Sequence, residues 1–210
     1  MGARMRLVGD IHGKTTEYYE LVKNEDYSLQ LGDFGFYSQL QILDNLDKDK
    51  HKVLAGNHCV SEVDDDGNFI KQKPHFLGDF GLTAHGGIEF FYIRGEYSID
   101  WMYRTEGYNY WRNEELSVEK MNEAIELYSQ VKPDIMISHG CPSSICDLID
   151  GKKRFNGVLL TPSRTAYCLQ AMFDAHQPKK WYFGHFHKDW EQTINGCEFR
   201  CLAELSFVDV

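Results

Sequence analysis

The sequence predicts an α/β fold built from β-α-β units, and three observations support this prediction. Short apolar runs typical of strands alternate with stretches whose apolar residues recur at helical spacing. Several of the runs stop at a glycine followed by a polar residue, as in Gly9-Asp10 and Gly32-Asp33. No internal repeat and no linker rich in proline, glycine or serine divides the 210 residues. We therefore expect one domain over residues 1–210.

The first half of the chain alternates strands and helices. Helical periodicity predicts helices at Thr15–Lys23 and Ser38–Asp47. The second helix would turn Leu40, Leu43 and Leu46 inward. Apolar runs predict three strands, each followed directly by a polar cluster: Arg4–Gly9, Tyr27–Leu31 and Lys52–Ala55. Sheets of β-α-β units bind ligands at such strand ends, so the polar clusters are candidates for a binding site.

The second half continues this alternation. Ser117 is a predicted N-cap, because Met121 and Ala124 follow it at helical spacing. A further helix is expected at Ser163–Ala175. Asn195-Gly196 is typical of a type I′ hairpin turn between two strands. The expected strands of this half are Ile88–Arg94, Asp134–Ser138, Trp181–Phe183, Glu191–Ile194 and Cys197–Leu202.

Seven side chains able to bind a metal follow the ends of five predicted strands. In an extended chain, residues two apart point the same way, so Asp10 and His12 could bind one cation. His185 and His187 repeat this spacing. Carboxylate, amide and imidazole ligands suit divalent ions that do not require thiolates. Each motif alone is common in turns, whereas the ordered set predicts a metal site: Asp10, His12, Asp33, Asn57, His139, His185 and His187.

This ordered set resembles the calcineurin-like metallophosphoesterase superfamily. The matching pieces span residues 9–187: Gly9-Asp10-Ile11-His12, Gly32-Asp33, Gly56-Asn57-His58, His139-Gly140 and Gly184-His185-Phe186-His187. The resemblance implies a four-layer α/β/β/α sandwich of two mixed sheets flanked by helices, with the metals at the carboxyl ends of strands. It implies one metal on Asp10, His12 and His187, and a second on Asn57, His139 and His185. Asp33 would bridge the two metals, and His58 would be the catalytic acid or phosphate-stabilising residue.

A centre of this kind would hydrolyse phosphoesters. Two cations roughly 3.5–4 Å apart can share a hydroxide, which would attack phosphorus in line. The expected cofactors are two divalent ions, with Mn²⁺ favoured and Fe, Zn, Ni or Co as alternatives, because the ligand set lacks thiolates. The favoured function is a phosphomonoesterase or phosphodiesterase acting on a small or nucleotide-like substrate. The alternatives are a protein serine/threonine phosphatase, a nuclease, and a scaffold that has kept the fold without catalysis.

Two departures from the family pattern bear on these alternatives. The run Asp33-Phe34-Gly35-Phe36-Tyr37 lacks the second Asp and the Asp-Arg-Gly found in protein serine/threonine phosphatases, which argues against that branch. Cys59 follows His58 where an acidic residue is common, which leaves open what orients His58. All seven ligand positions are filled, and this disfavours the scaffold.

The segment around residues 95–115 is expected to form a loop or cap over the site and to set substrate choice. Its aromatic residues between Tyr97 and Trp111 could stack on a base or form a small core under the loop. Arg94 and Arg104 flank the segment, and either could clamp a substrate phosphate or form an ion pair with a nearby acidic residue. The basic run Lys152-Lys153-Arg154 is expected to be a solvated loop, or to guide an anionic substrate.

Composition limits the partners. The formal net charge of −10 disfavours extended duplex nucleic acid, whose binding relies on Lys and Arg to neutralise phosphates. The expected partner is a phosphoester substrate. No apolar run is long enough to span a bilayer, and the first residues lack a signal-peptide core, so a cytoplasmic location is expected. The six cysteines lack zinc-ribbon spacing and are expected to be reduced. The oligomeric state stays open.

Overall fold

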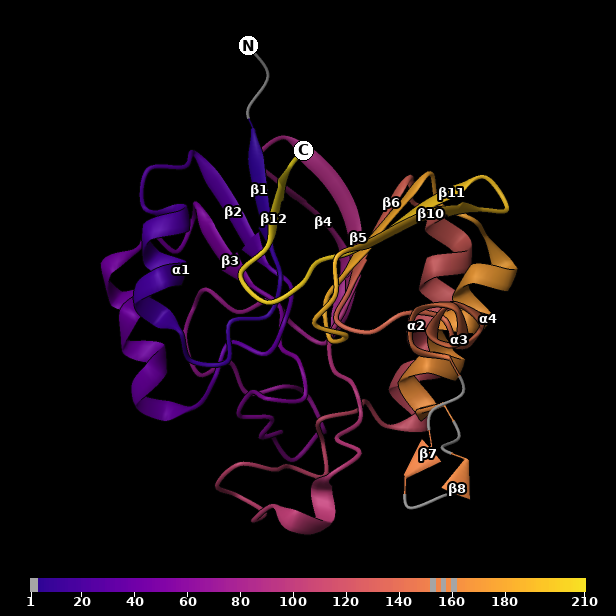
Figure 1. The fold of residues 1–210 in the computed structure, drawn as a ribbon, viewed down its shortest axis with the longest axis horizontal. Helices are drawn as coiled ribbons and strands as arrows, with labels where there is room; N and C mark the ends of the chain where they lie inside the picture. The colour runs from indigo at the N-terminus through magenta and orange to yellow at the C-terminus, as the bar shows by residue number, and fades with distance from the viewer. Residues whose placement is uncertain (1–3, 152–153, 156–157, 160–161) are drawn as a thin grey trace.

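The computed structural model describes residues 4–151, 154–155, 158–159 and 162–210. Two sheets face each other, and helical segments cover the outer face of each, which gives four layers (Figure 1). The first sheet is covered by α1 (Thr15–Val22) and the 3₁₀-helical η1 (Tyr37–Asn45). The second is covered by α2 (Val118–Val131), α3 (Ser143–Asp150) and α4 (Arg164–Ala175). The predicted α/β/β/α sandwich is confirmed.

Both sheets are mixed. The first has the order β12-β1-β2-β3, in which β1 (Met5–Val8), β2 (Tyr27–Gln30) and β3 (His51–Val53) are parallel and β12 (Phe207–Asp209) is antiparallel. The second has the order β10-β11-β9-β6-β5-β4, with four parallel strands in the middle and an antiparallel strand at each edge. Its strands are β4 (Phe80–His85), β5 (Ile88–Ile93), β6 (Ile135–Ser138), β9 (Lys180–Phe183), β10 (Trp190–Ile194) and β11 (Cys197–Cys201).

Three hydrophobic cores fill the three spaces between the four layers. Successive side chains of a strand point to opposite faces, so neighbouring apolar residues enter different cores. In β5, Phe90 packs between the sheets, while Phe91 packs under the helices of the second sheet. In β9, Tyr182 packs between the sheets, and Trp181 packs under the helices of the second sheet. This explains why these strands are continuous apolar runs in the sequence, since both of their faces are buried.

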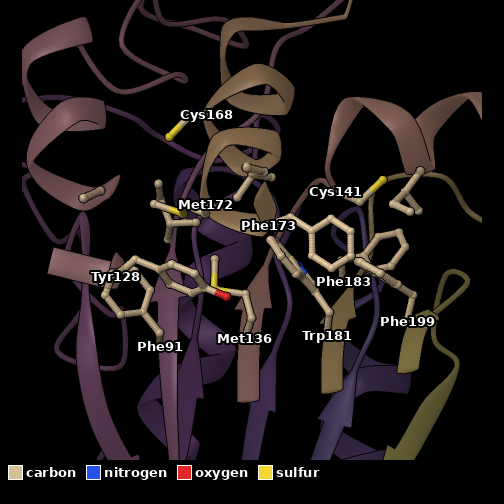
Figure 2. Close-up of a cluster of buried hydrophobic side chains, with 14 of the residues drawn as sticks. Phe91, Tyr128, Met136, Cys141, Cys168, Met172, Phe173, Trp181, Phe183 and Phe199 are labelled. Carbon is tan, nitrogen blue, oxygen red and sulfur yellow. The ribbon is translucent and has the colours of Figure 1, made fainter. Parts of the chain in front are cut away.

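The core under α2 and α4 is rich in aromatic side chains. Trp181 stacks on Phe199 with ring centroids 5.5 Å apart, and Phe173 of α4 meets both rings edge-on (Figure 2). Phe91 and Tyr128 form a further edge-to-face pair beside them. Such pairs add about 0.5–1.5 kcal/mol each to the free energy gained by burial. This packing fixes the strands whose ends carry part of the polar cluster.

Most predicted elements are present close to their expected bounds. Ser117 caps α2, where its side chain accepts a hydrogen bond from the Lys120 backbone N–H. Asn195 and Gly196 both have positive φ between β10 and β11, as a type I′ turn requires. The predicted helix at residues 38–47 is a 3₁₀ segment instead. Its inward leucines recur every third residue, which matches the three residues per turn of a 3₁₀-helix.

Several elements were missed by the sequence analysis. β4 is an edge strand that contains Gly81 and turns only His85 fully inward, so it lacks an alternating pattern. The helix α3 lacks a clear periodicity in the sequence, and β12 is only 3 residues long. The short strands β7 (Arg154–Phe155) and β8 (Val158–Leu159) pair with each other. The run Lys152-Lys153-Arg154 lies outside the residues whose side chains the structure describes. Among the described residues, no helix has the length and apolar character to cross a membrane.

Candidate metal centre

The seven predicted ligands come together where the two sheets meet, at the carboxyl ends of their parallel strands. Asp10 and His12 follow β1, Asp33 follows β2 and Asn57 follows β3. From the second sheet, His139 follows β6, and His185 and His187 follow β9. The chain around residues 95–115, with the short 3₁₀ turn η2 (Trp101–Tyr103), lies beyond these strand ends (Figure 1).

Four of these residues form the first possible cation site. One ligand atom from each of Asp10, His12, Asp33 and His187 lies within 4.8 Å of the others. The Nε2 atoms of His12 and His187 are 2.8 Å apart, and His187 Nε2 is 3.2 Å from Asp10 Oδ2. Burial alone would raise the Asp10 pKa, but hydrogen bonds from His12 and His187 outweigh it and lower this pKa to about 2.

A second possible cation site shares Asp33 with the first. Ligand atoms of Asp33, His139 and His185 again lie within 4.8 Å of one another. His139 Nε2 is 3.1 Å from Asp33 Oδ1 and 3.1 Å from Asn57 Oδ1. On its other side, His139 Nδ1 is 2.9 Å from the Leu31 carbonyl oxygen and donates to it. This hydrogen bond selects the tautomer whose Nε2 lone pair faces the carboxylate and the amide oxygen.

The chemistry of this second group fits a cation. A neutral His139 brings a lone pair within about 3 Å of two oxygen acceptors, which is unfavourable unless positive charge lies among them. Burial alone would lower the His139 pKa, but the Asp33 carboxylate raises it to about 10. The same interaction holds the Asp33 pKa below its ordinary value despite complete burial. The site therefore attracts positive charge strongly, and a divalent ion held by these donors would provide it.

The backbone at these positions is strained. Among the described residues, His12, Asp33, His185 and His187 have positive φ, between 43° and 68°. This region is unfavourable for residues other than glycine, and such strain clusters at functional sites. Close packing adds a second constraint. A Cβ on Gly32 would collide with the His139 ring, and one on Gly184 would collide with the Asp10 carboxylate. The glycines of the motifs thus let the ligands approach each other.

His58 lies beside the two groups and is held from both ends. Its backbone N–H donates to Asp33 Oδ1 at 2.7 Å. Its ring contacts Arg104, with 2.7 Å between His58 Nε2 and Arg104 Nη2. Burial lowers the His58 pKa, the Asp33 charge opposes this, and the Arg104 charge adds to it. Cys59, at the position where an acidic residue was expected, is fully buried in the core and receives the Gly56 backbone N–H at 3.4 Å. Arg104, rather than an acidic residue, is therefore the hydrogen-bond partner of the His58 ring.

Two adjoining cavities open at this site. The first, of about 600 Å³, is lined by His12, Asp33, Asn57, His185 and His187 of the candidate ligands, by His58 and by several residues of the 95–115 segment: Tyr97, Ser98, Ile99, Asp100 and Arg104. The second, of about 530 Å³, is lined by Tyr97, Trp101, Met102, Arg104, Glu106, Tyr110 and Arg112. Tyr97 and Arg104 belong to both linings, so the cavities are neighbours.

The two candidate arginines differ in their surroundings. Arg104 lies in the metal-ligand cavity and also forms the expected ion pair with Asp100, at 2.8 Å. Arg94 is 1% exposed and pairs with Asp79 at 2.7 Å, while its Nη1 donates to the Asn113 carbonyl. It lines neither cavity. The expectation of a surface ion pair with a close sequence neighbour was wrong for Arg94, and its buried structural pairing removes the reason to expect a substrate contact.

The aromatic residues of the segment fall into two groups with different surroundings. Trp111 is 5% exposed and stacks on Phe36 with centroids 5.4 Å apart, as in a small core under a loop. Trp101 and Tyr110 instead face the second cavity, with centroids 6.1 Å apart and ring planes 31° from parallel. Sequence reasoning did not single out Ser98, Glu114 or Glu204 at the site. None of the three lies in a motif or a periodic stretch.

Comparisons with known proteins agree with this geometry. Two similar solved structures are a dimetal phosphatase from Danio rerio and a phosphopantetheinyl hydrolase from Mycobacterium tuberculosis. The first has a TM-score of 0.56 at 12% identity, over 99% of this chain and 92% of that one. The second has a TM-score of 0.52 at 12% identity, over 97% and 91%. At such low identity, these likenesses establish the fold alone.

A search of curated proteins gives no match. The family model described as calcineurin-like phosphoesterase matches residues 3–189, which is most of the chain and includes every candidate ligand. The predicted resemblance is confirmed, and the chain belongs to the calcineurin-like phosphoesterase family.

Proposed function

We propose that this protein is a binuclear metal-dependent hydrolase of small phosphomonoesters or phosphodiesters. The observation that carries the proposal is the position of Asp33, which belongs to both groups of possible ligands. One carboxylate shared by two sets of donors is the arrangement that holds two cations side by side and offsets their mutual repulsion. Asp10, His12 and His187 would complete one site, and Asn57, His139 and His185 the other.

Two bound divalent ions would supply a nucleophile from water at neutral pH and would neutralise charge on the phosphoryl oxygens. The protein's own residues position the reaction. The Leu31 carbonyl fixes the His139 tautomer, and Asp10 accepts the His185 backbone N–H at 3.0 Å. These hydrogen bonds hold the ligands in place before a substrate arrives, which lowers the reorganisation needed in the transition state.

His58 and Arg104 would bind the phosphoryl group from the side of the 95–115 segment. The guanidinium offers several N–H donors in a plane, which suits the oxygens of a phosphate. The lowered pKa of His58 favours a neutral ring that donates one hydrogen bond. Of the two roles expected for His58, this environment supports phosphate stabilisation over proton donation.

The neighbouring cavity supports a substrate with a planar leaving group. Trp101 and Tyr110 line this cavity with their ring planes 31° from parallel, and Arg104 lines both this cavity and the one at the metal ligands. Stacking of a base on an aromatic side chain contributes about 1–3 kcal/mol. Cavities of several hundred Å³ suit small molecules. A nucleotide-like phosphoester would place its phosphate on the metals and its base in this second cavity.

The test is to count metals and measure turnover in matched variants. Metal-free protein titrated with Mn²⁺ should bind two ions per chain and then hydrolyse p-nitrophenyl phosphate or its bis ester. Asp33→Asn should abolish nearly all turnover and reduce the binding of both ions. Asp134→Asn is the control, because Asp134 is an exposed partner of Lys179 on the surface. Binding of a single ion, or an Asp33→Asn variant with a tenth of the wild-type kcat, would contradict the binuclear proposal.

The same assay separates the alternative substrates. A panel of cyclic nucleotides, nucleoside monophosphates, a phosphopeptide and single-stranded DNA would be compared at equal Mn²⁺. The proposal expects the highest kcat/KM among the nucleotides. A preference for the phosphopeptide or the DNA would instead favour a protein phosphatase or a nuclease.

A further inference from the structure

Asn57 poses a problem that the other candidate ligands do not. Its side chain ends in an oxygen and a nitrogen of nearly the same size, and only the oxygen can bind a cation. Rotation by half a turn about the last side-chain bond would present the NH₂ group to the site. Some other group must therefore hold the amide in the orientation with Oδ1 facing His139, where the two atoms are 3.1 Å apart.

The contact on the nitrogen side answers this problem. Asn57 Nδ2 donates to Ser98 Oγ at 3.0 Å. Ser98 in turn donates its hydroxyl to Glu114 Oε2 at 2.8 Å and its backbone N–H to Glu114 Oε1 at 2.5 Å. All three side chains are nearly inaccessible, at 3%, 1% and 2% exposure. Inside a protein, hydrogen bonds of this kind are strong, and an unpaired partner is costly.

The hydrogen bonds that link Glu114, Ser98 and Asn57 all donate in the same direction, toward Glu114. A carboxylate only accepts hydrogen bonds, so Glu114 makes the Ser98 hydroxyl a donor. The lone pairs left on Ser98 Oγ can then only accept, and so they select the NH₂ face of Asn57. Burial raises the pKa of Glu114 to about 8, although the two Ser98 donors and the Arg104 charge lower it, so the ionised form that imposes this direction predominates above pH 8.

We propose that Ser98 and Glu114 are positioning residues that hold Asn57 with its oxygen toward the second cation of the centre. The inference rests on the proposed binuclear function and deepens it. It also gives the 95–115 segment a second purpose, since the segment that borders the substrate cavities carries the groups that orient a metal ligand. Hydrogen bonds behind a metal ligand commonly change metal affinity by about 10- to 100-fold when removed.

The experiment is a Mn²⁺ titration of metal-free protein. Calorimetry measures the two affinities, and the electron paramagnetic resonance spectrum shows whether the ions are spin-coupled. In Ser98→Ala and Glu114→Gln, the second ion should bind about 10- to 100-fold more weakly, while the first binds as in wild type. At two equivalents of Mn²⁺, the spin-coupled pair signal should give way to that of isolated ions. A merely structural defect would weaken both ions together.

Glu115→Gln is the matched control. Glu115 is also a buried glutamate in the same segment, but the hydrogen bonds that it accepts come from Thr165 and Arg164 rather than from Ser98. The Glu115→Gln variant should leave the affinities for both Mn²⁺ ions within about twofold of wild type. Thermal unfolding of each metal-free variant reports whether the fold survives. Equal weakening of the second ion in Glu115→Gln and Glu114→Gln would overturn the inference.

A second experiment replaces Asn57 with a metal ligand whose two terminal side-chain atoms are both oxygens. The carboxylate of Asn57→Asp offers an oxygen whichever way it turns, so adding Ser98→Ala to it should change the second affinity far less than in wild type. If Ser98→Ala weakens the second ion equally in both backgrounds, or in neither, the positioning role is wrong. Failure of wild type to bind two ions would instead refute the binuclear proposal itself.

Discussion

The Arg104 guanidinium lies against the His58 ring, with Nη2 only 2.7 Å from Nε2. The hydrogen bond requires that His58 Nε2 accept, so the ring is neutral in this arrangement. Arg104 is fixed from behind by Asp100 and by the Asn109 carbonyl oxygen. A cation thus lies beside the phosphate-stabilising candidate, while the position where an acidic residue was expected is held by the buried Cys59. The site gains one more positive group toward an anionic substrate.

The first prediction follows from this contact. Because Arg104 faces the metal-ligand cavity, Arg104→Ala should lower kcat/KM ten- to a hundredfold for every phosphoester, including a minimal aryl phosphate. This loss corresponds to about 1.4–2.8 kcal/mol of transition-state stabilisation. Arg200→Ala, which removes an ion pair with Glu191 on the surface, is the control and should change kcat/KM little. Unchanged hydrolysis of the aryl phosphate by Arg104→Ala would remove Arg104 from the phosphoryl site.

A second prediction concerns metal removal. A chelator should abolish hydrolysis, and Mn²⁺ should restore it best among the divalent ions tested, because the donors include no thiolate. His187→Ala and His139→Ala each remove a ligand of one group only. Each should therefore leave about one tightly bound ion per chain by metal analysis. His176→Ala, at the end of α4, should keep both ions. Retention of two tight ions in both ligand variants would show that the groups are assigned wrongly.

The sequence was sufficient to predict the candidate ligands because each belongs to a short local motif at a strand end. Asp10 and His12 lie in one group of possible ligands, whereas His185 and His187 divide between the two groups, and the β-α-β order brings the motifs to one edge. The positive φ values at these residues were not visible in the sequence, although the adjacent glycines indicated tight turns.

The contacts that depend on distant residues could not be predicted. Ser98 lies 41 residues from Asn57 and 16 from Glu114, in a stretch without periodicity. The partner of Arg94 is Asp79 rather than one of its near neighbours. In such segments the hydrogen bonds of the folded chain decide which side chains meet, and no repeating pattern records them.

The third prediction tests the aromatic cavity. Trp101→Ala should lower kcat/KM for a nucleoside monophosphate by about tenfold or more, because base stacking contributes about 1–3 kcal/mol. Glycerol phosphate has no planar group, and its hydrolysis should change less than twofold. Tyr108→Ala is the control, since Tyr108 is an exposed aromatic of the same segment that lines neither cavity. An equal loss on both substrates would mean that Trp101 supports the segment rather than the leaving group.

The fourth prediction concerns stability in weak acid. His51 is 4% exposed, its Nδ1 lies 2.9 Å from Ser28 Oγ, and burial lowers its pKa from 6.5 to about 4. Between these pH values His51 binds a proton in the unfolded chain but not in the folded one. The contribution of neutral His51 to stability is therefore complete above pH 6.5 and is lost as the pH falls toward 4. The full effect is about 3 kcal/mol. Urea unfolding of metal-free protein should therefore show a smaller loss of stability from pH 7 to pH 5 in His51→Gln than in wild type. Equal losses in the two proteins would show that His51 does not titrate in this range.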